Sequence, residues 1–427
     1  MSYESTLAYI HSESWQKHKN GLDRIRTLLH ALGDPQKRLR FIHVAGTNGK
    51  GSVCAMLDSV LRRAGYRTGL FTSPYLRRFN ERMRVNGEEI PDETLEEICD
   101  LVRPAAEAME EKPSEFELIT AIGMLWFLRC RCDVVVLEVG LGGEFDSTNV
   151  IDPPECAVIC SIGLDHTAML GDTVPEIAMA KAGILKHGAP AVTGSGNAEA
   201  DDVFRRVCAQ RQIELHETDF SRLRILRSDE DGSVFDFDGL DALRLRLCGV
   251  FQPRNAAVAV TALRVLRERG YRIGDGDIRE GLASAQWPGR FEILGRRPLL
   301  ILDGAHNPHG VRAAAESLRC LVPGRVTFLV AAMKDKSVDE MLSVLIPLAD
   351  RFVTVKPDYS RAMEPEEIAE KIRALGGTAE PAKTVEEGVT SAVRIAGPDG
   401  TVCALGSLYI SDAVRQAAEH LRREGRE

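Results

Sequence analysis

The segment Gly46–Ser52 (Gly-Thr-Asn-Gly-Lys-Gly-Ser) combines glycines, a lysine and hydroxyl groups in a pattern that can bind phosphate. It follows the hydrophobic run Phe41–Ala45 and leads into Ser52–Ala64, whose apolar residues recur at helical spacing. Glycines let backbone N–H groups close around phosphate oxygens, and a helix N-terminus favours an anion. Lys50 offers a positive charge to the β- and γ-phosphates of a nucleotide, and Ser52 offers a hydroxyl to phosphate or metal.

This loop departs from the standard phosphate-loop pattern. No glycine stands five residues before Gly49, and Gly51 separates Lys50 from Ser52. A glycine-rich turn taken alone can be purely structural. Because a strand precedes this loop and a helix follows it, we predict a nucleotide-binding site here.

Two more hydrophobic runs lead to residues that bind metals. Asp133–Val139 contains Glu138 and continues into a glycine-rich turn, and Ala157–Ile162 is soon followed by His166. Taken singly, the glutamate could cap a loop and the histidine could be an ordinary loop residue. Nucleotide enzymes hold Mg²⁺ at the carboxyl ends of parallel strands, and a second cation is useful when the acceptor is also an anion. The two strand ends beside a phosphate loop therefore predict metal sites.

Lys181 lies in a segment with a helix-start signature. Thr173 and Glu176 form a capping-box pattern with an early proline, and the predicted helix continues to Leu185. Taken alone, Lys181 would be interpreted as a surface lysine on that helix.

Length and composition limit the class of protein. The chain has 427 residues, which predicts two domains, and the sequence around Trp287–Arg290 places them at 1–288 and 289–427. A net charge of −9 gives no basic surface for nucleic acid or anionic membrane. No apolar stretch reaches the roughly 20 residues of a membrane span, and the N-terminus has no signal-peptide core. Ten scattered cysteines without a CxxC pair favour reduced thiols, so we expect a cytoplasmic protein.

Short β-branched runs alternate with helical patterns, which predicts an α/β protein with parallel sheets. We expect strands at Phe41–Ala45, Val134–Val139, Ala157–Ile162, Leu299–Leu302, Val326–Ala331, Arg351–Val355 and Val402–Leu405. The alternating residues between about 215 and 247 predict a small antiparallel sheet attached to the first domain.

Together these motifs resemble folylpolyglutamate synthases, a branch of the Mur ligase superfamily. The resemblance covers residues 43 to 409 in family order, almost the whole chain. It is carried by His43–Ser52, Thr72–Pro74, Phe79–Arg82, Val85–Gly87, Glu138–Gly143, Asp146–Asn149, Gly163–Thr167, Lys181–Ile184, Pro288–Phe291, Asp303–His309 and Gly406–Tyr409.

The resemblance implies an N-terminal ATPase domain of P-loop type and a C-terminal Rossmann-like domain, with the active site between them. It also implies residue roles, for ATP and two Mg²⁺ ions. Gly46, Thr47, Asn48, Gly49, Lys50, Gly51 and Ser52 would hold the ATP phosphates; Ser73 and Glu138 would bind one Mg²⁺ and His166 the second; Lys181 would be carbamylated by CO₂ and serve the second metal; Asn255, Arg290 and Asp303 would contact the nucleotide; and His306 would lie near the reacting end of the substrate.

The implied reaction joins L-glutamate to tetrahydrofolate or its polyglutamates. ATP converts the folate carboxylate to an acyl phosphate, the glutamate amine attacks it, and ADP and phosphate leave. The family resemblance also suggests a monomer. Two positions depart from the family, Glu144 where arginine is usual and Tyr75 where histidine is usual, and both border the pterin side of the substrate.

Three alternatives remain beside this interpretation. A dihydrofolate synthase, or a bifunctional enzyme, performs identical chemistry on dihydropteroate. Glu144 favours the glutamate-extending activity but does not exclude the bifunctional enzyme. A cell-wall Mur ligase would need a further domain before residue 43. A nucleotide switch without ligase chemistry would account for the phosphate loop and Glu138, but not for His166, Lys181 and the Asp303–His306 motif.

Overall fold

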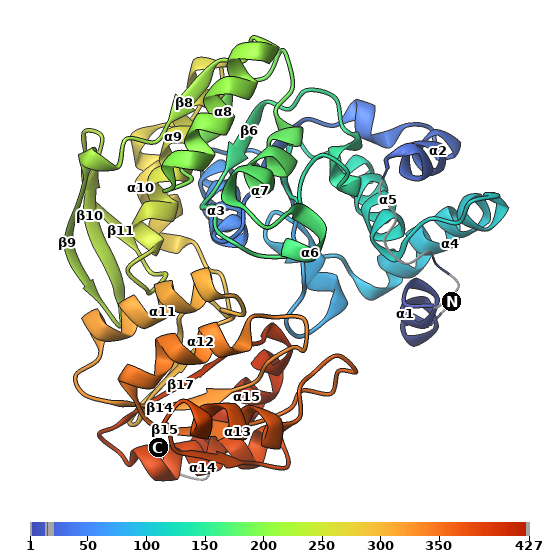
Figure 1. Ribbon diagram of the computed structural model, residues 1–427. Helices are drawn as coiled ribbons and strands as arrows, with labels where there is room; N and C mark the ends of the chain where they lie inside the picture. Colours follow the sequence, from blue (N-terminus) through green and yellow to red (C-terminus); the bar gives the residue numbers. More distant parts are fainter. Residues whose placement is uncertain (1, 13–14, 16–20, 424–427) are drawn as a thin grey trace. The chain divides into compact units, whose positions relative to one another are not determined.

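The computed structural model describes residues 2–12, 15 and 21–423 of the chain (Figure 1). The chain forms two compact units. The first comprises Met1–Leu223 and Arg254–Ala285, and the second comprises Arg224–Pro253 and Gln286–Glu427. The domain limits 1–288 and 289–427 stay a prediction. In the compact units, residues 224–253 group with the second unit instead of the first.

An eight-stranded sheet forms the centre of the first unit, with the order β4-β3-β2-β5-β1-β6-β7-β8. The six strands from β2 to β8 in that order run parallel, and β3 and β4 extend the sheet with antiparallel pairing. The strands are β1 (Phe41–Ala45), β2 (Thr68–Phe71), β3 (Met83–Val85), β4 (Glu88–Glu89), β5 (Val134–Glu138), β6 (Cys156–Ile159), β7 (Ala191–Thr193) and β8 (Leu215–Glu217).

Helices supply the two apolar layers against this sheet. The larger core cluster packs Ile25, Val102 and Phe127 with Leu137 of β5. A separate cluster packs Phe204 with Ile159 of β6 and Ala191 of β7. The helices are α1 (Tyr3–Ile10), α2 (Asp23–Ala31), α3 (Lys50–Arg63), α4 (Asp92–Ala108), α5 (Glu115–Arg129), α6 (Thr167–Leu170), α7 (Val174–Lys181), α8 (Ala198–Arg211), α9 (Gln252–Glu268) and α10 (Asp275–Ser284). Short 3-10 turns are η1 (Pro35–Arg38), η2 (Phe79–Arg82), η3 (Ser147–Val150), η4 (Ala182–Ile184) and η5 (Phe220–Arg222).

The second unit contains a six-stranded sheet with the order β12-β13-β17-β14-β15-β16, in which only β12 is antiparallel to its neighbour. Its strands are β12 (Glu292–Arg296), β13 (Leu299–Leu302), β14 (Val326–Val330), β15 (Ala349–Thr354), β16 (Ala379–Pro381) and β17 (Thr401–Leu405). Its helices are α11 (Pro308–Leu321), α12 (Val338–Leu345), α13 (Pro365–Ala374), α14 (Val385–Ala396) and α15 (Ser411–Arg423), with 3-10 turns η6 (Ile346–Leu348) and η7 (Leu408–Ile410). Two core clusters, one containing Phe328 and Phe352 and the other Leu329 and Val353, fill its two faces.

The small antiparallel sheet forms as predicted, but it groups with the other unit. Strands β9 (Leu223–Asp229), β10 (Gly232–Phe237) and β11 (Leu240–Leu245) follow the order β11-β10-β9, and residues 224–253 cluster with the second unit. Arg296 pairs with Glu230 and Asp231, and Cys248 joins a core cluster of the second unit. Residues 215–217, which we included in the same segment, instead form β8 of the large parallel sheet. These attachments depend on contacts distant in sequence, which alternation does not reveal.

The helix that carries Lys181 begins as predicted and ends earlier. Thr173 caps α7 and accepts a hydrogen bond from the Glu176 N–H at 3.4 Å, but the α-helix stops at Lys181 and η4 follows. The ten cysteines are all free thiols, and only Cys320 is exposed. None of the helices described is long and apolar enough to cross a membrane.

Candidate functional site

The strand order brings four of the predicted motifs to neighbouring strand ends. In the first unit, β2, β5, β1 and β6 are adjacent and parallel. Their carboxyl ends lead respectively to Ser73, Glu138, the Gly46–Ser52 loop and the Asp165–His166 turn. The carboxyl edge of a parallel sheet is the usual ligand site in this class of fold.

Backbone hydrogen bonds anchor the start of the phosphate loop to the turn after β6, and the end of the loop begins helix α3. The backbone N–H groups of Thr47 and Asn48 both donate to the carbonyl of Ser161, at 2.8 and 3.3 Å. The first N–H of α3 to reach a carbonyl four residues back belongs to Val53. The N–H groups of Gly49 to Ser52 therefore form the helix end, where an anion is favoured by the peptide dipoles.

Asn255 lies against the phosphate loop. Gly49 has a φ of +85°, and a Cβ added there would stand 2.6 Å from the Asn255 side-chain oxygen. Asn255 is buried near the start of α9 and belongs to the same compact unit as the loop. The structure thus brings together two residues that the resemblance assigned to the nucleotide, although about 200 positions separate them.

Glu138 and Ser73 meet at the ends of β5 and β2. The Ser73 backbone N–H donates to Glu138 Oε2 at 3.0 Å, and the Glu138 side chain is buried. A buried carboxylate beside the hydroxyl-bearing Ser73 offers hard oxygen donors of the kind that Mg²⁺ prefers. The residues present therefore fit one Mg²⁺ ion.

Lys181 and Lys50 both point to the same backbone oxygen. Lys181 Nζ donates to the carbonyl of Gly46 at 3.0 Å, and Lys50 Nζ donates to it at 3.1 Å. Lys181 is buried, and its burial, together with the positive charge of Lys50, lowers its pKa to about 7. This is not the surface lysine that the isolated helix pattern suggested. A buried lysine with a depressed pKa is a frequent sign of a functional site.

His166 occupies the turn after β6 in a left-handed backbone conformation, with a φ of 51°. Its side chain is 40% exposed, and Nε2 lies 3.7 Å from Asp165 Oδ2. Within residues 2–12, 15 and 21–423, no three His, Cys, Asp or Glu side chains cluster into a metal site. A second metal at His166 would need an oxygen ligand that an unmodified ammonium group at Lys181 does not provide.

The turn that follows Glu138 is fastened to the segment that follows Lys181. Asn149 Nδ2 donates to the carbonyls of Glu144 and Gly183, at 3.0 and 3.2 Å. The Glu144 N–H donates to the carbonyl of Ala180 at 2.9 Å. A Cβ on Gly183 would come within 2.3 Å of Glu144 Cα, so only glycine permits this approach.

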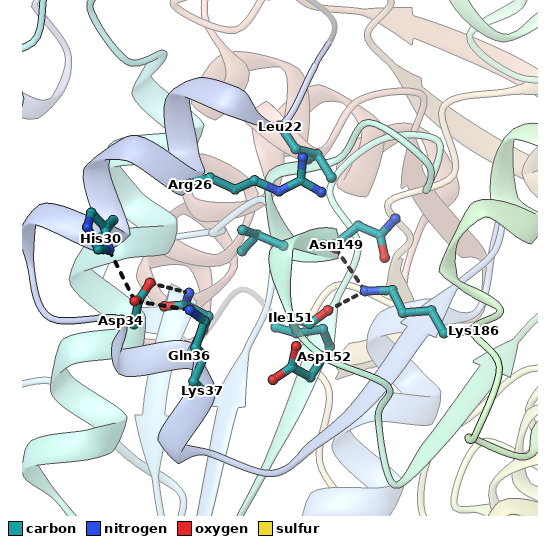
Figure 2. A pocket seen from close by; sticks show the side chains of 11 residues that line it. Leu22, Arg26, His30, Asp34, Gln36, Lys37, Asn149, Ile151, Asp152 and Lys186 are labelled. Atoms are coloured by element: carbon teal, nitrogen blue, oxygen red, sulfur yellow. Dashed lines mark hydrogen bonds and ion pairs between the residues drawn. The ribbon is translucent and has the colours of Figure 1, made fainter.

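Lys186 has a structural task that the sequence did not reveal. Its ammonium donates to the carbonyls of Asn149 and Ile151, and it borders a cavity of about 480 Å³ between α2, η1 and the 149–152 turn (Figure 2). Partial burial lowers the pKa of Lys186 to about 8. The side chain holds a turn beside the site, and it could have been suspected only from its proximity to Lys181 in sequence.

A buried polar chain supports the same turn. His43 Nε2 contacts Thr148 Oγ1 at 2.9 Å, and Thr148 Oγ1 donates to Asp146. Burial lowers the pKa of His43 to about 3, so this ring is neutral. Burial raises the pKa of Asp146. His43 and Asp146 therefore connect the strand below the phosphate loop to the turn after Glu138, and neither was singled out as a site residue in the sequence.

In the second unit, Arg290, Asp303 and His306 gather at the end of β13. The buried Asp303 carboxylate accepts hydrogen bonds from the N–H groups of Phe291 and Ala305, each at 2.7 Å. A Cβ on Gly304 would stand 2.8 Å from an Arg290 guanidinium nitrogen. Burial raises the pKa of Asp303, and the charge of Arg290 opposes that rise.

His306 is oriented by its own loop. Its Nδ1 lies 2.8 Å from the carbonyl of Gly304. Because a carbonyl oxygen only accepts hydrogen bonds, Nδ1 carries the proton and Nε2 is the basic nitrogen. Both oxygens of Asp303 accept hydrogen bonds from backbone groups of the neighbouring loops, and its contact with a nucleotide stays a prediction.

Comparison with known proteins matches both parts of the chain. Residues 44–263 match the Mur ligase middle domain, and residues 289–408 match the Mur ligase, glutamate ligase domain. The chain is 36% identical to folylpolyglutamate synthase of Lacticaseibacillus casei, covering 97% of this chain and 98% of the relative. It is 39% identical to dihydrofolate synthase/folylpolyglutamate synthase of Bacillus subtilis, covering 84% and 86%.

Solved structures agree with these relatives. Mycobacterium tuberculosis folylpolyglutamate synthase complexed with ADP superposes with a TM-score of 0.89 at 28% identity, covering 98% of this chain and 99% of that one. E. coli FolC in complex with DHPP and ADP superposes with a TM-score of 0.86 at 30% identity, covering 100% and 98%. The chain therefore belongs to the folylpolyglutamate synthase and dihydrofolate synthase family of ATP-dependent Mur ligases.

Proposed function

We propose that this protein is a folylpolyglutamate synthase, which uses ATP to join L-glutamate to tetrahydrofolate or its polyglutamates. The observation that carries the proposal is the convergence of Lys50 and Lys181 on the Gly46 carbonyl, beside the buried Glu138. A phosphate loop alone would serve any nucleotide-binding protein. A buried lysine of lowered pKa at that loop is a frequent sign of a functional site, and it distinguishes this chain from a protein that only binds a nucleotide.

In the first step an oxygen of the folate carboxylate attacks the γ-phosphorus of ATP, and the bond to ADP breaks. Two anions must approach each other, so neutralising their charge is the main task of the protein. We assign that task to Lys50 and to the N–H groups at the start of α3. In the second step the glutamate amine attacks the acyl carbon and phosphate leaves. His306 Nε2 is proposed to take the amine proton, and Arg290 and Asp303 are proposed to serve the nucleotide.

Lys181 is proposed to react with CO₂. At a pKa of about 7, a large share of the side chain is a neutral amine near physiological pH. The amine nitrogen bonds to the carbon of CO₂ and releases one proton, which gives a carbamate with one negative charge. The carbamate replaces one of two ammonium groups that share the Gly46 oxygen, so it relieves their repulsion.

Two Mg²⁺ ions are proposed beside the loop, and they would neutralise the phosphate charges. Ser73 and Glu138 would hold one of them, and Glu138 is already fixed by the Ser73 N–H. His166 and the Lys181 carbamate would hold the other. The chemistry of the donors supports the first ion directly, and it supports the second only with a modified Lys181.

A second candidate activity is dihydrofolate synthesis, alone or in a bifunctional enzyme. The relative from Bacillus subtilis carries both names, and the E. coli neighbour was solved with DHPP. The chemistry at the phosphate loop would be unchanged. Only the acceptor would differ, and Glu144 and Tyr75, which depart from the family pattern, are proposed to border it.

The deciding experiment measures ADP formation by the purified protein with ATP, Mg²⁺ and glutamate, with tetrahydrofolate or dihydropteroate as acceptor. Turnover with tetrahydrofolate alone supports a dedicated folylpolyglutamate synthase. Turnover with both acceptors supports a bifunctional enzyme, and turnover with dihydropteroate alone supports a dihydrofolate synthase. Absence of turnover with either acceptor would refute the proposal. A cytoplasmic location and a monomeric state also stay predictions.

A further inference from the structure

The loop between β2 and β3 contains the Phe79–Arg82 motif, to which the proposed reaction assigns no role. Ser73 begins this loop and the segment Phe79–Arg82 ends it, where η2 leads into β3. The base of the loop is closed, because the Thr72 N–H donates to the carbonyl of Arg82 at 2.9 Å. Residues 74–78 within it form no helix or strand. One backbone hydrogen bond, from the Glu81 N–H to the Arg78 carbonyl at 3.1 Å, reaches this stretch, and side-chain contacts must supply the rest of its support.

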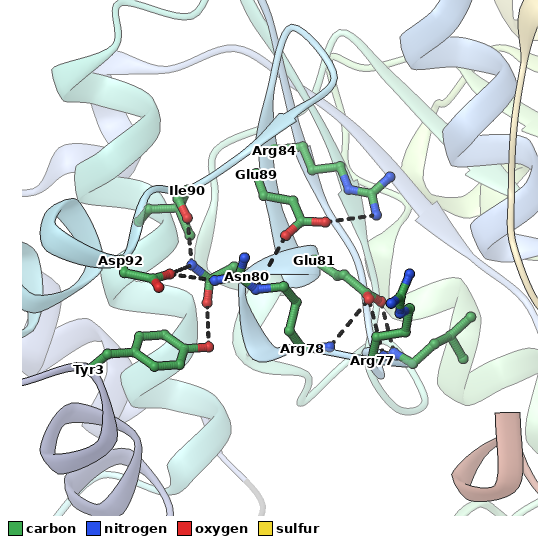
Figure 3. A network of polar contacts seen from close by, with 10 residues as sticks. Tyr3, Arg77, Arg78, Asn80, Glu81, Arg84, Glu89, Ile90 and Asp92 are labelled. Atoms are coloured by element: carbon green, nitrogen blue, oxygen red, sulfur yellow. Dashed lines mark hydrogen bonds and ion pairs between the residues drawn. The ribbon is translucent and has the colours of Figure 1, made fainter. Parts of the chain in front are cut away.

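The Glu81 carboxylate organises the middle of this loop. It accepts hydrogen bonds from three consecutive backbone N–H groups, those of Leu76 at 2.9 Å, Arg77 at 3.1 Å and Arg78 at 3.3 Å (Figure 3). Three successive N–H groups around one carboxylate make an anion-binding turn, and such charge-assisted bonds are stronger than neutral ones. Because Glu81 belongs to η2, these hydrogen bonds connect residues 76–78 in the middle of the loop to η2 at its end.

Other side chains fix the far end of the loop around Asn80. The Leu76 N–H, in contrast, donates to Glu81. Asn80 accepts a hydrogen bond from the Tyr3 hydroxyl at 2.8 Å and donates to Asp92 at 2.8 Å, which connects η2 to α1 and α4. Arg78 reaches the same Asp92. Figure 3 shows the Arg78 side chain extending away from the Glu81 carboxylate. The frame around η2 is thus fixed, and Glu81 transfers that fixed position to residues 76–78.

Only Pro74 and Tyr75 separate Ser73 from Leu76. The proline ring fixes one backbone dihedral, and the Tyr75 ring lies 5.1 Å from the Arg82 guanidinium. This short link is stiff, so a displacement of Leu76 is passed to Ser73. Ser73 meets Glu138 from the neighbouring strand end. The position of the Ser73 hydroxyl relative to Glu138 therefore depends on the turn that Glu81 holds.

We propose that Glu81 is a positioning residue, which folds the 74–78 turn so that Ser73 presents its hydroxyl to the divalent cation beside Glu138. This inference rests on the proposed metal site but not on the identity of the acceptor. Glu81 touches neither nucleotide nor cation in this role, and it acts through the backbone of Leu76, Arg77 and Arg78.

The test compares Glu81→Gln with Glu89→Gln. Glutamine keeps the size of Glu81 but replaces one acceptor oxygen with an N–H₂ group that faces backbone N–H donors. Glu89 belongs to the same network and lies 3.7 Å from the Arg78 guanidinium and 3.8 Å from that of Arg84, whereas the backbone N–H groups of Leu76, Arg77 and Arg78 donate to Glu81. The matched pair removes one negative charge each and separates loop positioning from local charge.

Binding of Mn²⁺ to the protein–ADP complex, followed by electron paramagnetic resonance, is the readout. Glu81→Gln should raise the Mn²⁺ dissociation constant about tenfold, while ADP binding without metal stays at the wild-type value. Glu81→Asp keeps the charge on a shorter side chain, so its Mn²⁺ dissociation constant should lie between those of the wild type and Glu81→Gln. Glu89→Gln should match the wild type in both measurements. Melting by circular dichroism verifies that each variant is folded.

Wild-type Mn²⁺ affinity in a folded Glu81→Gln variant would overturn the inference, and so would an equal loss in Glu89→Gln. If the wild-type protein itself adds nothing to the affinity of ADP for Mn²⁺, the metal site and the role of Glu81 both fail. If Mn²⁺ binds as expected but no folate acceptor yields ADP, the proposed reaction fails while the role of Glu81 stands.

Discussion

Lys50 and Lys181 donate hydrogen bonds to one carbonyl oxygen, that of Gly46, at 3.1 and 3.0 Å. Lys181 is buried, which disfavours its charged form, and the ammonium group of Lys50 on the same acceptor adds a repulsion. This is why the pKa of Lys181 falls to about 7. The fold thus makes the unmodified Lys181 side chain a neutral amine for a large share of molecules near pH 7.

Replacing Lys181 by alanine should reduce turnover at least about a hundredfold, because the proposed carbamate is lost while Lys50 can still bind the ATP phosphates. Added formate or acetate should restore part of the activity by supplying the missing carboxylate oxygens. The measurement is ADP release at saturating substrates, with and without the added anion. Lys186→Met is the control, since Lys186 holds only backbone carbonyls and its loss should not be rescued by anions. Full activity of Lys181→Ala would refute the role.

Stability should depend on pH through Lys181. Its pKa is about 7 in the folded chain and near 10.5 in the unfolded chain, so between these values the unfolded state binds more protons. The stabilising effect of raising the pH therefore appears from about pH 7 upward and is complete above the unfolded value. In CO₂-free buffer, the stability of the wild type relative to Lys181→Met should rise between pH 7 and pH 10. Urea unfolding at a series of pH values measures this, and a flat difference would contradict the burial of a neutral amine.

Gly49→Ala should abolish tight ADP binding. The new Cβ would stand 2.6 Å from the Asn255 side chain in a backbone conformation with a φ of +85°. Gly65→Ala is the matched control, because Gly65 has a φ of +88° with open space around it. Both variants should lose roughly 1–2 kcal/mol of stability from left-handed strain, but only Gly49→Ala should lose ADP affinity in a calorimetric titration. Equal ADP affinities would show that the Asn255 contact is unimportant.

The buried pair of Arg24 and Glu117 should contribute strongly to the stability of the first unit. It joins α2 to α5 at 3.1 Å, and both side chains are nearly fully buried. Arg24→Met or Glu117→Gln alone should cost about 3–5 kcal/mol, because an uncompensated buried charge or polar group remains, and the double variant should cost less than the sum. The exposed pair Arg129 and Glu97, 2.6 Å apart, should cost about 1 kcal/mol or less when broken. Urea unfolding gives all four values, and additive single effects would exclude coupling.

Asp303→Asn should disturb the loops of the second unit. One of the two oxygens that receive the N–H groups of Phe291 and Ala305 becomes an N–H₂ donor, so one backbone N–H loses its acceptor. We expect a lower melting temperature and a reduced rate of ADP release. Asp399→Asn is the control, because Asp399 pairs only with the exposed Arg297. An unchanged melting temperature in Asp303→Asn would indicate that the carboxylate is not needed as a double acceptor.

Much of the site could be predicted from sequence because its signals are local. The phosphate loop is defined by residues 46–52 and by the strand and helix that adjoin it. The start of α7 follows from Thr173 and Glu176, whose capping contacts span three residues. Strand Phe41–Ala45 was identified to the residue, since a fully buried parallel strand is a short continuous apolar run.

The tertiary structure alone decided how these parts meet. Strand order placed β2, β5, β1 and β6 side by side, and so brought Ser73 next to Glu138. Sequence patterns state which segments are strands, but pairing depends on the packing of whole faces, which no local window contains. The attachment of residues 224–253 to the second unit arose in the same way.

The ionisation of Lys181 also belongs to the tertiary structure. Its helix pattern is that of a surface lysine, and only the packing of α7 against the phosphate loop buries it next to Lys50. Residue type and spacing therefore determined the fold class and the chemical groups available to this protein. Burial and long-range contact determined what those groups do, because desolvation and neighbouring charges act through space and not along the chain.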